Sequence, residues 1–137
     1  LSAPEMKNVI EKCNQAGNNN VTLCERGNSY GYNNLVVDML NFQIMKDLDV
    51  PVIFDATHSL QLPGGLGNAA GGRREYLLPL AKAGLSQGIA GLFIEAHPEP
   101  DLAKCDGPCA ISTDEIANVL SQLSELDDFI KNQDSNI

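Results

Sequence analysis

The sequence predicts an α/β fold in which parallel strands alternate with helices. Three short apolar segments, residues 20–25, 52–56 and 91–94, have the composition of buried strands, and segments with helical periodicity follow each of them. Each strand ends in charged or imidazole side chains, which is where α/β proteins keep their chemistry. The order is one helix, then strand and helix three times, and such units build a parallel sheet covered by helices.

The first helix is predicted from a capping box, S-x-x-E, that Ser2 and Glu5 form. Pro4 lies early in the helix, where its missing N–H costs little. Apolar residues follow at helical spacing as far as Cys13, and Gly17 is placed to end the segment. The chain therefore begins with one amphipathic helix.

The first strand is expected at residues 20–25, with a polar, glycine-rich loop over 27–34 after it. Residues 35–48 are apolar with mixed periodicity. This pattern predicts a short extended piece followed by a helix over about 42–48. Pro51 then opens the second strand.

A long glycine-rich loop over residues 58–72 is predicted to be mobile. It leads to a helix from about Arg73 to Gly88. The third strand begins at Gly91, and a second long loop covers residues 97–111.

The final helix begins with a second capping box, Ser112 and Glu115. Its buried stripe is predicted to consist of Ile116, Val119, Leu120, Leu123 and Ile130. Three parallel strands cannot close a barrel. The chain is therefore either a small open α/β domain with helices on both faces of its sheet or part of a larger barrel.

Composition excludes several classes of partner. The net charge of −9 argues against nucleic acid, because neutralising phosphates needs a basic face. No apolar run approaches the roughly 20 residues of a membrane span. Any anionic ligand must be held by a few placed cations, and Arg26, Arg73 and Arg74 are the candidates.

The four cysteines do not have the spacing of a metal cluster or a disulfide framework. Cys105 and Cys109 form a C-x3-C pair without a partner pair, and Cys24 lies inside an apolar strand. We expect all of them, with Cys13, to be reduced thiols, as is usual in cytosolic proteins. This points to a cytoplasmic protein.

Four segments resemble the 3-deoxy-D-manno-octulosonate 8-phosphate synthase family. They are CERGNSYGYNNLVVDM (24–39), FDATHSLQ (54–61), GGRR (71–74) and FIEAHPEPDLAKCDGP (93–108). The resemblance covers essentially the whole chain. It implies that residues 1–137 are the C-terminal half of a single (β/α)8 TIM-barrel domain whose other half lies upstream of Leu1, and that the fragment alone is inactive.

The resemblance also implies an activity. The family condenses phosphoenolpyruvate with D-arabinose 5-phosphate and water, giving 3-deoxy-D-manno-octulosonate 8-phosphate and phosphate for lipopolysaccharide biosynthesis. Its members are typically cytoplasmic homotetramers. Two alternatives stay open: a related synthase that uses erythrose 4-phosphate, and a non-catalytic α/β module that binds a phosphorylated metabolite.

Site residues follow from the matched positions. Arg26 matches the arginine that holds the phosphoenolpyruvate phosphate, and a guanidinium suits a phosphate because it offers a planar fork of donors. His58 matches the histidine beside the phosphate and the reacting carbon, and imidazole titrates near neutral pH. Glu95 and Asp106 match the acids that complete the site. Each assignment has a plainer alternative: Arg26 paired to Glu25 or Asp55, and His58 as a strand cap.

A metal is possible but is not expected to be required. His58, Glu95 and Asp106 match ligands of a divalent cation in the metal-dependent branch of the family, together with a cysteine that would lie upstream of this chain. The KCDGP segment at 104–108 looks more like the metal-independent branch. His97 is expected either to support the acids or to form a turn.

Overall fold

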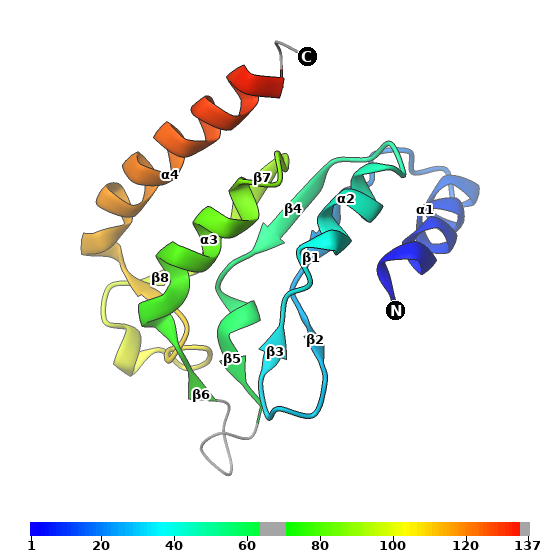
Figure 1. Cartoon of the computed structure of the whole chain (residues 1–137). Helices are drawn as coiled ribbons and strands as arrows, with labels where there is room; N and C mark the ends of the chain where they lie inside the picture. The colour runs from blue at the N-terminus through cyan, green and yellow to red at the C-terminus, as the bar shows by residue number, and fades with distance from the viewer. Residues whose placement is uncertain (64–70, 135–137) are drawn as a thin grey trace.

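The core of the molecule is a three-stranded parallel sheet. The computed structural model describes residues 1–63 and 71–134. Its central strand, β4 (Val52–Asp55), lies between β1 (Leu23–Glu25) and β7 (Gly91–Phe93) (Figure 1). The register of the sheet places Cys24, Ile53 and Gly91 side by side. The three predicted strands are confirmed, each one to three residues shorter than expected.

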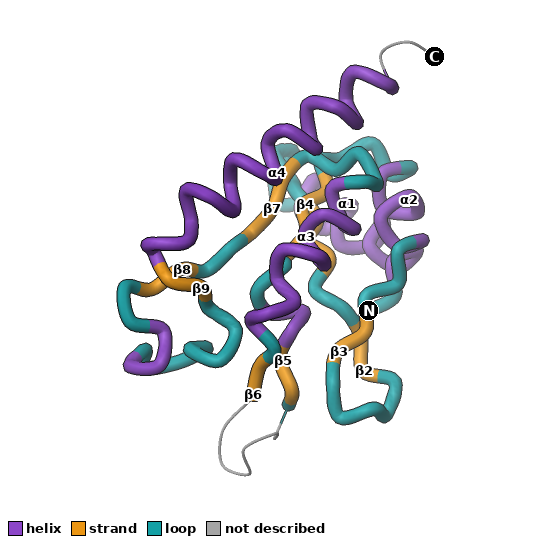
Figure 2. Tube along the Cα trace, turned by 60° about the vertical axis from the view of Figure 1, so that its left-hand side comes forward, coloured by secondary structure: helices purple, strands orange, loops and turns teal. Residues whose placement is uncertain are grey.

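A helix follows each of the three strands, as predicted. Over the described residues, the α-helices are α1 (Met6–Gln15), α2 (Leu40–Lys46), α3 (Leu77–Leu85) and α4 (Thr113–Asp134). Short 3-10 helices cover Ala3–Glu5, His58–Leu60, Arg74–Tyr76 and Pro100–Leu102. Helix α3 packs between α4 and the sheet, and Figure 2 shows α4 as the longest helix, reaching past the sheet.

Three small two-stranded sheets lie beyond the carboxyl ends of the main strands. Strands β2 (Asn28–Ser29) and β3 (Leu35–Val36) pair antiparallel, as do β5 (Gln61–Leu62) and β6 (Gly71–Gly72); β8 (Ala96–His97) and β9 (Ile111–Ser112) pair parallel (Figure 2). None of these pairs was predicted. Part of the loop that was predicted to be mobile, residues 64–70, lies outside the described residues.

Two helix starts differ from prediction. Helix α2 begins at Leu40 because the Asp38 carboxylate accepts the Leu40 N–H at 3.0 Å and so caps the helix. Helix α3 begins only at Leu77, because Arg73 has a non-helical backbone and the Arg74 N–H binds the Pro108 carbonyl at 3.3 Å. A tertiary contact therefore overrides the helical pattern at this start.

Both predicted capping boxes form their main contact. The Ser2 N–H donates to Glu5 Oε2 at 2.7 Å, and the Ser112 N–H donates to Glu115 Oε2 at 3.2 Å. The Glu5 bonds lower the pKa of that carboxyl, since they favour its charged form. Local sequence chemistry thus sets the start of the first and last helices.

The two faces of the sheet differ in how they are covered. On one face Phe54 is fully buried, with the Phe42 ring edge-on at 5.3 Å and Gly84 of α3 against it. On the other face Cys24 and Phe93 remain exposed. Among the described residues, helices α2 and α3 therefore pack on the Phe54 face alone. This arrangement differs from that of a small open α/β domain, in which helices would cover both faces of the sheet.

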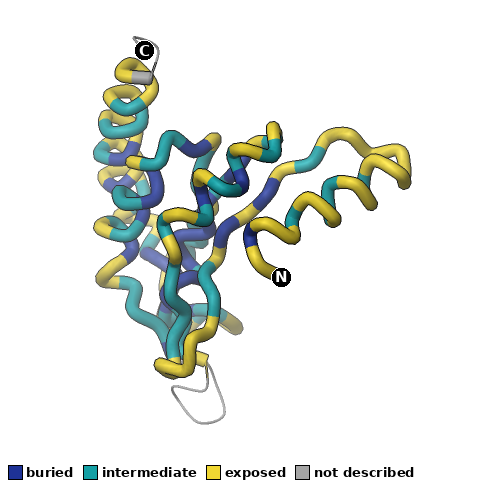
Figure 3. Tube along the Cα trace, turned by 45° about the vertical axis from the view of Figure 1, so that its right-hand side comes forward, coloured by how far each residue is buried: buried dark blue, intermediate teal, exposed yellow. Residues whose placement is uncertain are grey.

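Helix α1 has no buried residue, and Figure 3 shows it projecting from the sheet. All four cysteines are free, as predicted. Over residues 1–63 and 71–134, no helix combines the length and the apolar character that crossing a membrane requires.

Candidate active site

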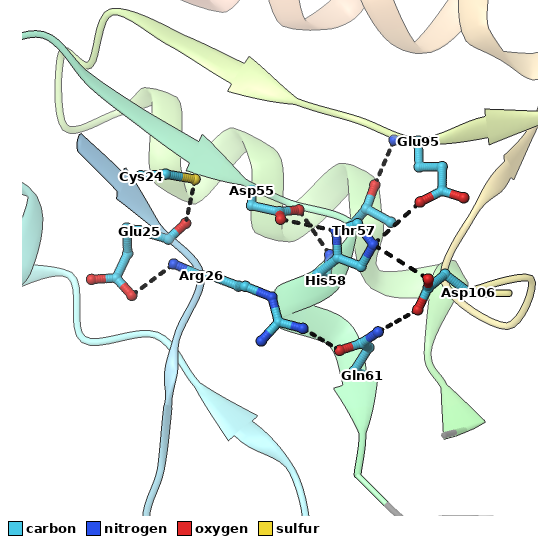
Figure 4. A network of polar contacts seen from close by, with 9 residues as sticks. All are labelled: Cys24, Glu25, Arg26, Asp55, Thr57, His58, Gln61, Glu95 and Asp106. Atoms are coloured by element: carbon cyan, nitrogen blue, oxygen red, sulfur yellow. Dashed lines mark hydrogen bonds and ion pairs between the residues drawn. The ribbon is translucent and has the colours of Figure 1, made fainter. Parts of the chain in front are cut away.

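The carboxyl ends of the three parallel strands bring the predicted site residues together. Arg26 follows β1, His58 begins the 3-10 helix after β4, and Glu95 follows β7. Asp106 comes from the loop between β8 and β9 and reaches the same place (Figure 4). Parallel strands carry their ends to one edge, so this convergence follows from the fold.

Two hydrogen bonds that one carboxylate accepts fix His58. Asp55 Oδ1 accepts the His58 backbone N–H at 2.9 Å, and Asp55 Oδ2 lies 2.9 Å from His58 Nδ1. Asp55 is buried, and an ionised carboxylate only accepts, so Nδ1 carries the proton of that bond. His58 Nε2 is left to face the other acids.

Two carboxylates face that second nitrogen. Glu95 Oε2 lies 3.2 Å from His58 Nε2, and Asp106 Oδ2 lies 3.8 Å from it. One ligand atom from each of the three residues lies within 4.8 Å of the others. The three residues are partly open to solvent. Their ligand atoms are arranged to hold either a divalent cation or an ordered water molecule that takes part in proton transfer.

Neither acid is placed by its own strand alone. The Glu95 N–H donates to the buried Thr57 Oγ1 at 2.8 Å, which ties the end of β7 to the end of β4. Asp106 has a left-handed backbone, φ 53°, and its carbonyl accepts the N–H groups of Cys109 and Ala110 at 2.8 and 3.0 Å. A closed turn therefore presents the Asp106 carboxylate.

Close packing seats that turn against its neighbours. A Cβ at Gly72 would lie 2.5 Å from both the Cys109 sulfur and the Pro108 carbonyl oxygen, and one at Gly107 would lie 2.3 Å from the Pro100 carbonyl oxygen. Only glycine allows these approaches. The loop that carries Asp106 is thus held against β6.

Arg26 is exposed and contacts the site through Gln61. Its Nη2 donates to Gln61 Oε1, and Gln61 Nε2 donates to Asp106 Oδ1 (Figure 4). The buried Glu25 carboxylate binds the backbone N–H groups of Arg26 and Gly27 at 3.0 and 2.6 Å. These contacts differ from the plainer alternative, in which the Arg26 guanidinium would pair with Glu25 or Asp55.

The other predicted cations lie elsewhere. Arg74 forms an ion pair with Asp101, and Arg73 lies at the start of the 3-10 helix Arg74–Tyr76. His97 Nδ1 accepts the Glu99 N–H at 3.0 Å, a local turn contact. Of the two roles considered for His97, the structure shows the turn.

The thiols near the site are poor nucleophiles. The bond to Asp106 and its negative charge raise the pKa of the exposed Cys105 thiol, since both disfavour the thiolate. Burial, followed by the charge of Asp55, raises the pKa of Cys24.

Sequence reasoning missed three residues that hold the site together: Asp55, Thr57 and Gln61. The Asp55 position was a detectable signal, because an acid at a strand end three residues before a histidine can accept both the backbone and the ring N–H. Nothing in the local pattern marks Thr57 or Gln61, whose partners are 38 and 45 residues away along the chain.

A histidine, two acids and an arginine at the carboxyl ends of parallel β/α units define a site of the (β/α)-barrel class. The chain matches the DAHP synthetase I family over residues 1–132, and it belongs to that family. The predicted fold class, parallel strands alternating with helices as part of a TIM barrel, is confirmed.

Individual relatives are close. The chain is 61% identical over 132 residues to the 2-dehydro-3-deoxyphosphooctonate aldolase of Stutzerimonas stutzeri (strain A1501) and 60% identical over 131 residues to that of Pseudomonas putida (strain GB-1). Each match covers 96% of this chain and 47% of the relative. The chain therefore spans about half the length of the curated relatives it matches, and the predicted resemblance is confirmed.

Proposed function

We propose that the protein condenses phosphoenolpyruvate with D-arabinose 5-phosphate and water to give 3-deoxy-D-manno-octulosonate 8-phosphate and inorganic phosphate. One observation carries the proposal. An exposed guanidinium and a His58–Glu95–Asp106 cluster meet at one edge of the sheet, in a chain about 60% identical to proteins named 2-dehydro-3-deoxyphosphooctonate aldolase.

Arg26 serves as the phosphate clamp of phosphoenolpyruvate. Its side chain is exposed, its backbone is fixed by the buried Glu25, and its guanidinium donates to the neutral Gln61. A guanidinium held beside a neutral amide keeps its charge available for an anion. A preplaced charge also needs little reorganisation when phosphate leaves.

His58 transfers the proton that phosphate departure requires. The carbon–carbon bond forms between the enol carbon and the sugar aldehyde, water adds to the neighbouring carbon, and the tetrahedral intermediate loses phosphate by C–O cleavage. Asp55 holds the ring so that Nε2 faces this chemistry. Glu95 and Asp106, on the far side of Nε2, orient the water and the sugar hydroxyls.

We propose that no metal is required, because the KCDGP segment resembles the metal-independent branch. The donor set nevertheless fits a divalent cation, which His58 Nε2, Glu95 and Asp106 would hold. A bound cation would supply Lewis-acid activation of water. Assays of chelator-treated protein with and without added Mn²⁺ test this: activity that depends on the metal contradicts the proposal.

The complete protein is the right sample for the main test, and phosphate release is the measurement. Phosphate should be released from phosphoenolpyruvate with arabinose 5-phosphate and much more slowly with erythrose 4-phosphate. The reverse preference would assign the related synthase. No release with either sugar, combined with tight phosphate binding, would assign a non-catalytic module.

The remaining features of the proposal concern the whole protein. Residues 1–137 would be the C-terminal half of a single barrel domain in a cytoplasmic homotetramer that acts in lipopolysaccharide biosynthesis and binds neither nucleic acid nor membrane. The acidic net charge of −9 supports the absence of nucleic acid. Light scattering of the complete protein tests the tetramer, and a mass of one or two subunits would contradict it.

A further inference from the structure

We propose that Gln61 is a positioning residue that bridges the phosphate clamp and the acid cluster and holds Asp106 in place when phosphate binds at Arg26. The inference rests on the proposed function and deepens it. Gln61 lies at the start of β5, directly after the 3-10 helix that carries His58, and its side chain lies between the two groups (Figure 4).

The contacts use both ends of one amide. Gln61 Oε1 accepts from Arg26 Nη2, and Gln61 Nε2 donates to Asp106 Oδ1. The other oxygen of Asp106 lies 3.8 Å from His58 Nε2. A chain of polar contacts thus runs from the guanidinium through the amide and the carboxylate to the imidazole.

Glutamine is suited to this place by its chemistry. A guanidinium only donates and an ionised carboxylate only accepts, so a residue between them must offer an acceptor to one and a donor to the other. A neutral primary amide offers both without adding a charge. A carboxylate at position 61 would repel Asp106 and form an ion pair with Arg26, while an apolar side chain would bind neither.

The linkage has a consequence for substrate binding. A phosphate that binds Arg26 through Nη2 would compete with Gln61, because Gln61 Oε1 accepts from that nitrogen. When the guanidinium turns to phosphate, Gln61 keeps its bond to Asp106 as its remaining contact. Gln61 therefore holds Asp106 during turnover and is only a weak competitor for the phosphate.

Two substitutions of similar size separate these roles. Gln61→Met removes donor and acceptor but keeps the length of the side chain. It should lower kcat about 10- to 100-fold, because Asp106 loses a charge-assisted bond, and leave the KM for phosphoenolpyruvate within about threefold. Gln61→Glu should lower kcat as well and raise that KM about tenfold or more, because the new carboxylate holds Arg26.

Binding of inorganic phosphate gives a readout that does not depend on turnover. Measured by calorimetry on the complete protein, the Kd for phosphate should be unchanged or lower in Gln61→Met and about tenfold higher in Gln61→Glu. Gln122→Met is the matched control, since Gln122 lies on α4 and accepts from Lys82 at 3.0 Å, and it should change neither quantity.

Several outcomes would overturn the proposal. One is a Gln61→Met protein with kcat within about twofold of the unsubstituted protein. Another is an equal rise of KM in the Met and Glu variants, which would indicate a merely structural role. If Gln61→Met does not fold, Gln61→Asn replaces it, because the shorter amide keeps the chemistry but cannot reach both partners; full activity in that variant also contradicts the proposal.

Failure of the proposed function can be told apart from failure of this inference. An unsubstituted protein without turnover of phosphoenolpyruvate and arabinose 5-phosphate contradicts the function. The phosphate Kd of the Met and Glu variants still tests the contact between Gln61 and Arg26 in that case. Normal turnover with unchanged constants in both variants contradicts the inference alone.

Discussion

Strand β4 passes through two environments that are held together differently. Phe54 lies in an apolar environment, packed against Phe42 of α2 and Gly84 of α3. One residue later, Asp55 begins a polar network whose members bind one another: Asp55 to His58, and His58 to Glu95. The first region depends on close contact of apolar surface, and the second on the direction of individual hydrogen bonds.

Because of this difference, substitutions at neighbouring positions of β4 should affect different properties: stability on the apolar side and activity on the polar side. Burial of apolar surface supplies most of the free energy of folding. The exposed half of the polar network is solvated and adds little to it. Changes at Phe54 or its neighbours should therefore mainly lower the free energy of unfolding, whereas changes at His58 should leave the protein folded and inactive.

The largest expected effect concerns the two histidines. His58→Gln should lower kcat about 10²- to 10⁴-fold, because proton transfer is lost, with a small change in the unfolding midpoint. His97→Gln is the control, since His97 only accepts the Glu99 N–H in a turn. Steady-state kinetics and thermal unfolding of both variants check this, and equal losses of activity would show that the site is placed wrongly.

A smaller effect is expected at the boundary of the two regions. Asp55→Asn should lower kcat about 10- to 100-fold, because the amide donor faces His58 Nδ1 and forces the other tautomer. Nitrogen NMR of the His58 ring should show the proton moved to Nε2. An unchanged tautomer together with reduced activity would mean that Asp55 acts in another way.

In the apolar region, Gly84→Ala should destabilise the fold by about 1–3 kcal/mol, because the new methyl group would lie 2.4 Å from the Phe54 ring. Helix propensity alone would favour alanine over glycine by about 1 kcal/mol. The sign of the change in the free energy of unfolding therefore distinguishes the packing clash from the effect of helix propensity. Denaturant unfolding measures it. Phe54→Leu in the same protein should recover part of the loss; simple additivity of the two changes would contradict the contact.

The smallest effect concerns thiol reactivity. The pKa of Cys105 is raised by Asp106, and that of Cys109 is raised mainly by burial, so at pH 8 both are largely protonated and slow to alkylate. Asp106→Asn should speed alkylation of Cys105 several-fold by increasing its thiolate fraction, and should leave Cys109 slow. Mass spectrometry of iodoacetamide-treated protein measures both, and no change at Cys105 would contradict the charge effect.

The sequence predicted the regular elements well because their signals are local. Alternation of apolar strands with helical periodicity placed the three parallel strands, and their ends placed Arg26, His58 and Glu95 at one edge. Asp106 was reached through family resemblance alone, since it lies in a loop with no periodic signal. Its roles, like those of the other site residues, stay predictions.

The parts that the sequence did not predict depend on contacts between distant segments. The pairing of β8 with β9 uses the Ile111 N–H and the Glu95 carbonyl, 3.1 Å apart. Helix α3 starts late because the Arg74 N–H binds the Pro108 carbonyl. No spacing rule within one element encodes such contacts.

The buried Thr57 hydroxyl has a consequence for how such a site can be transferred. Thr57 binds Glu95, Asp55 and His58 bind each other, and Gln61 reaches Arg26 and Asp106, so residues 55–61 contact Arg26, Glu95 and Asp106. This seven-residue stretch therefore positions the loops that carry the other residues of the site. Grafting it onto a different barrel strand would carry the reference geometry with it, while the surrounding loops could vary.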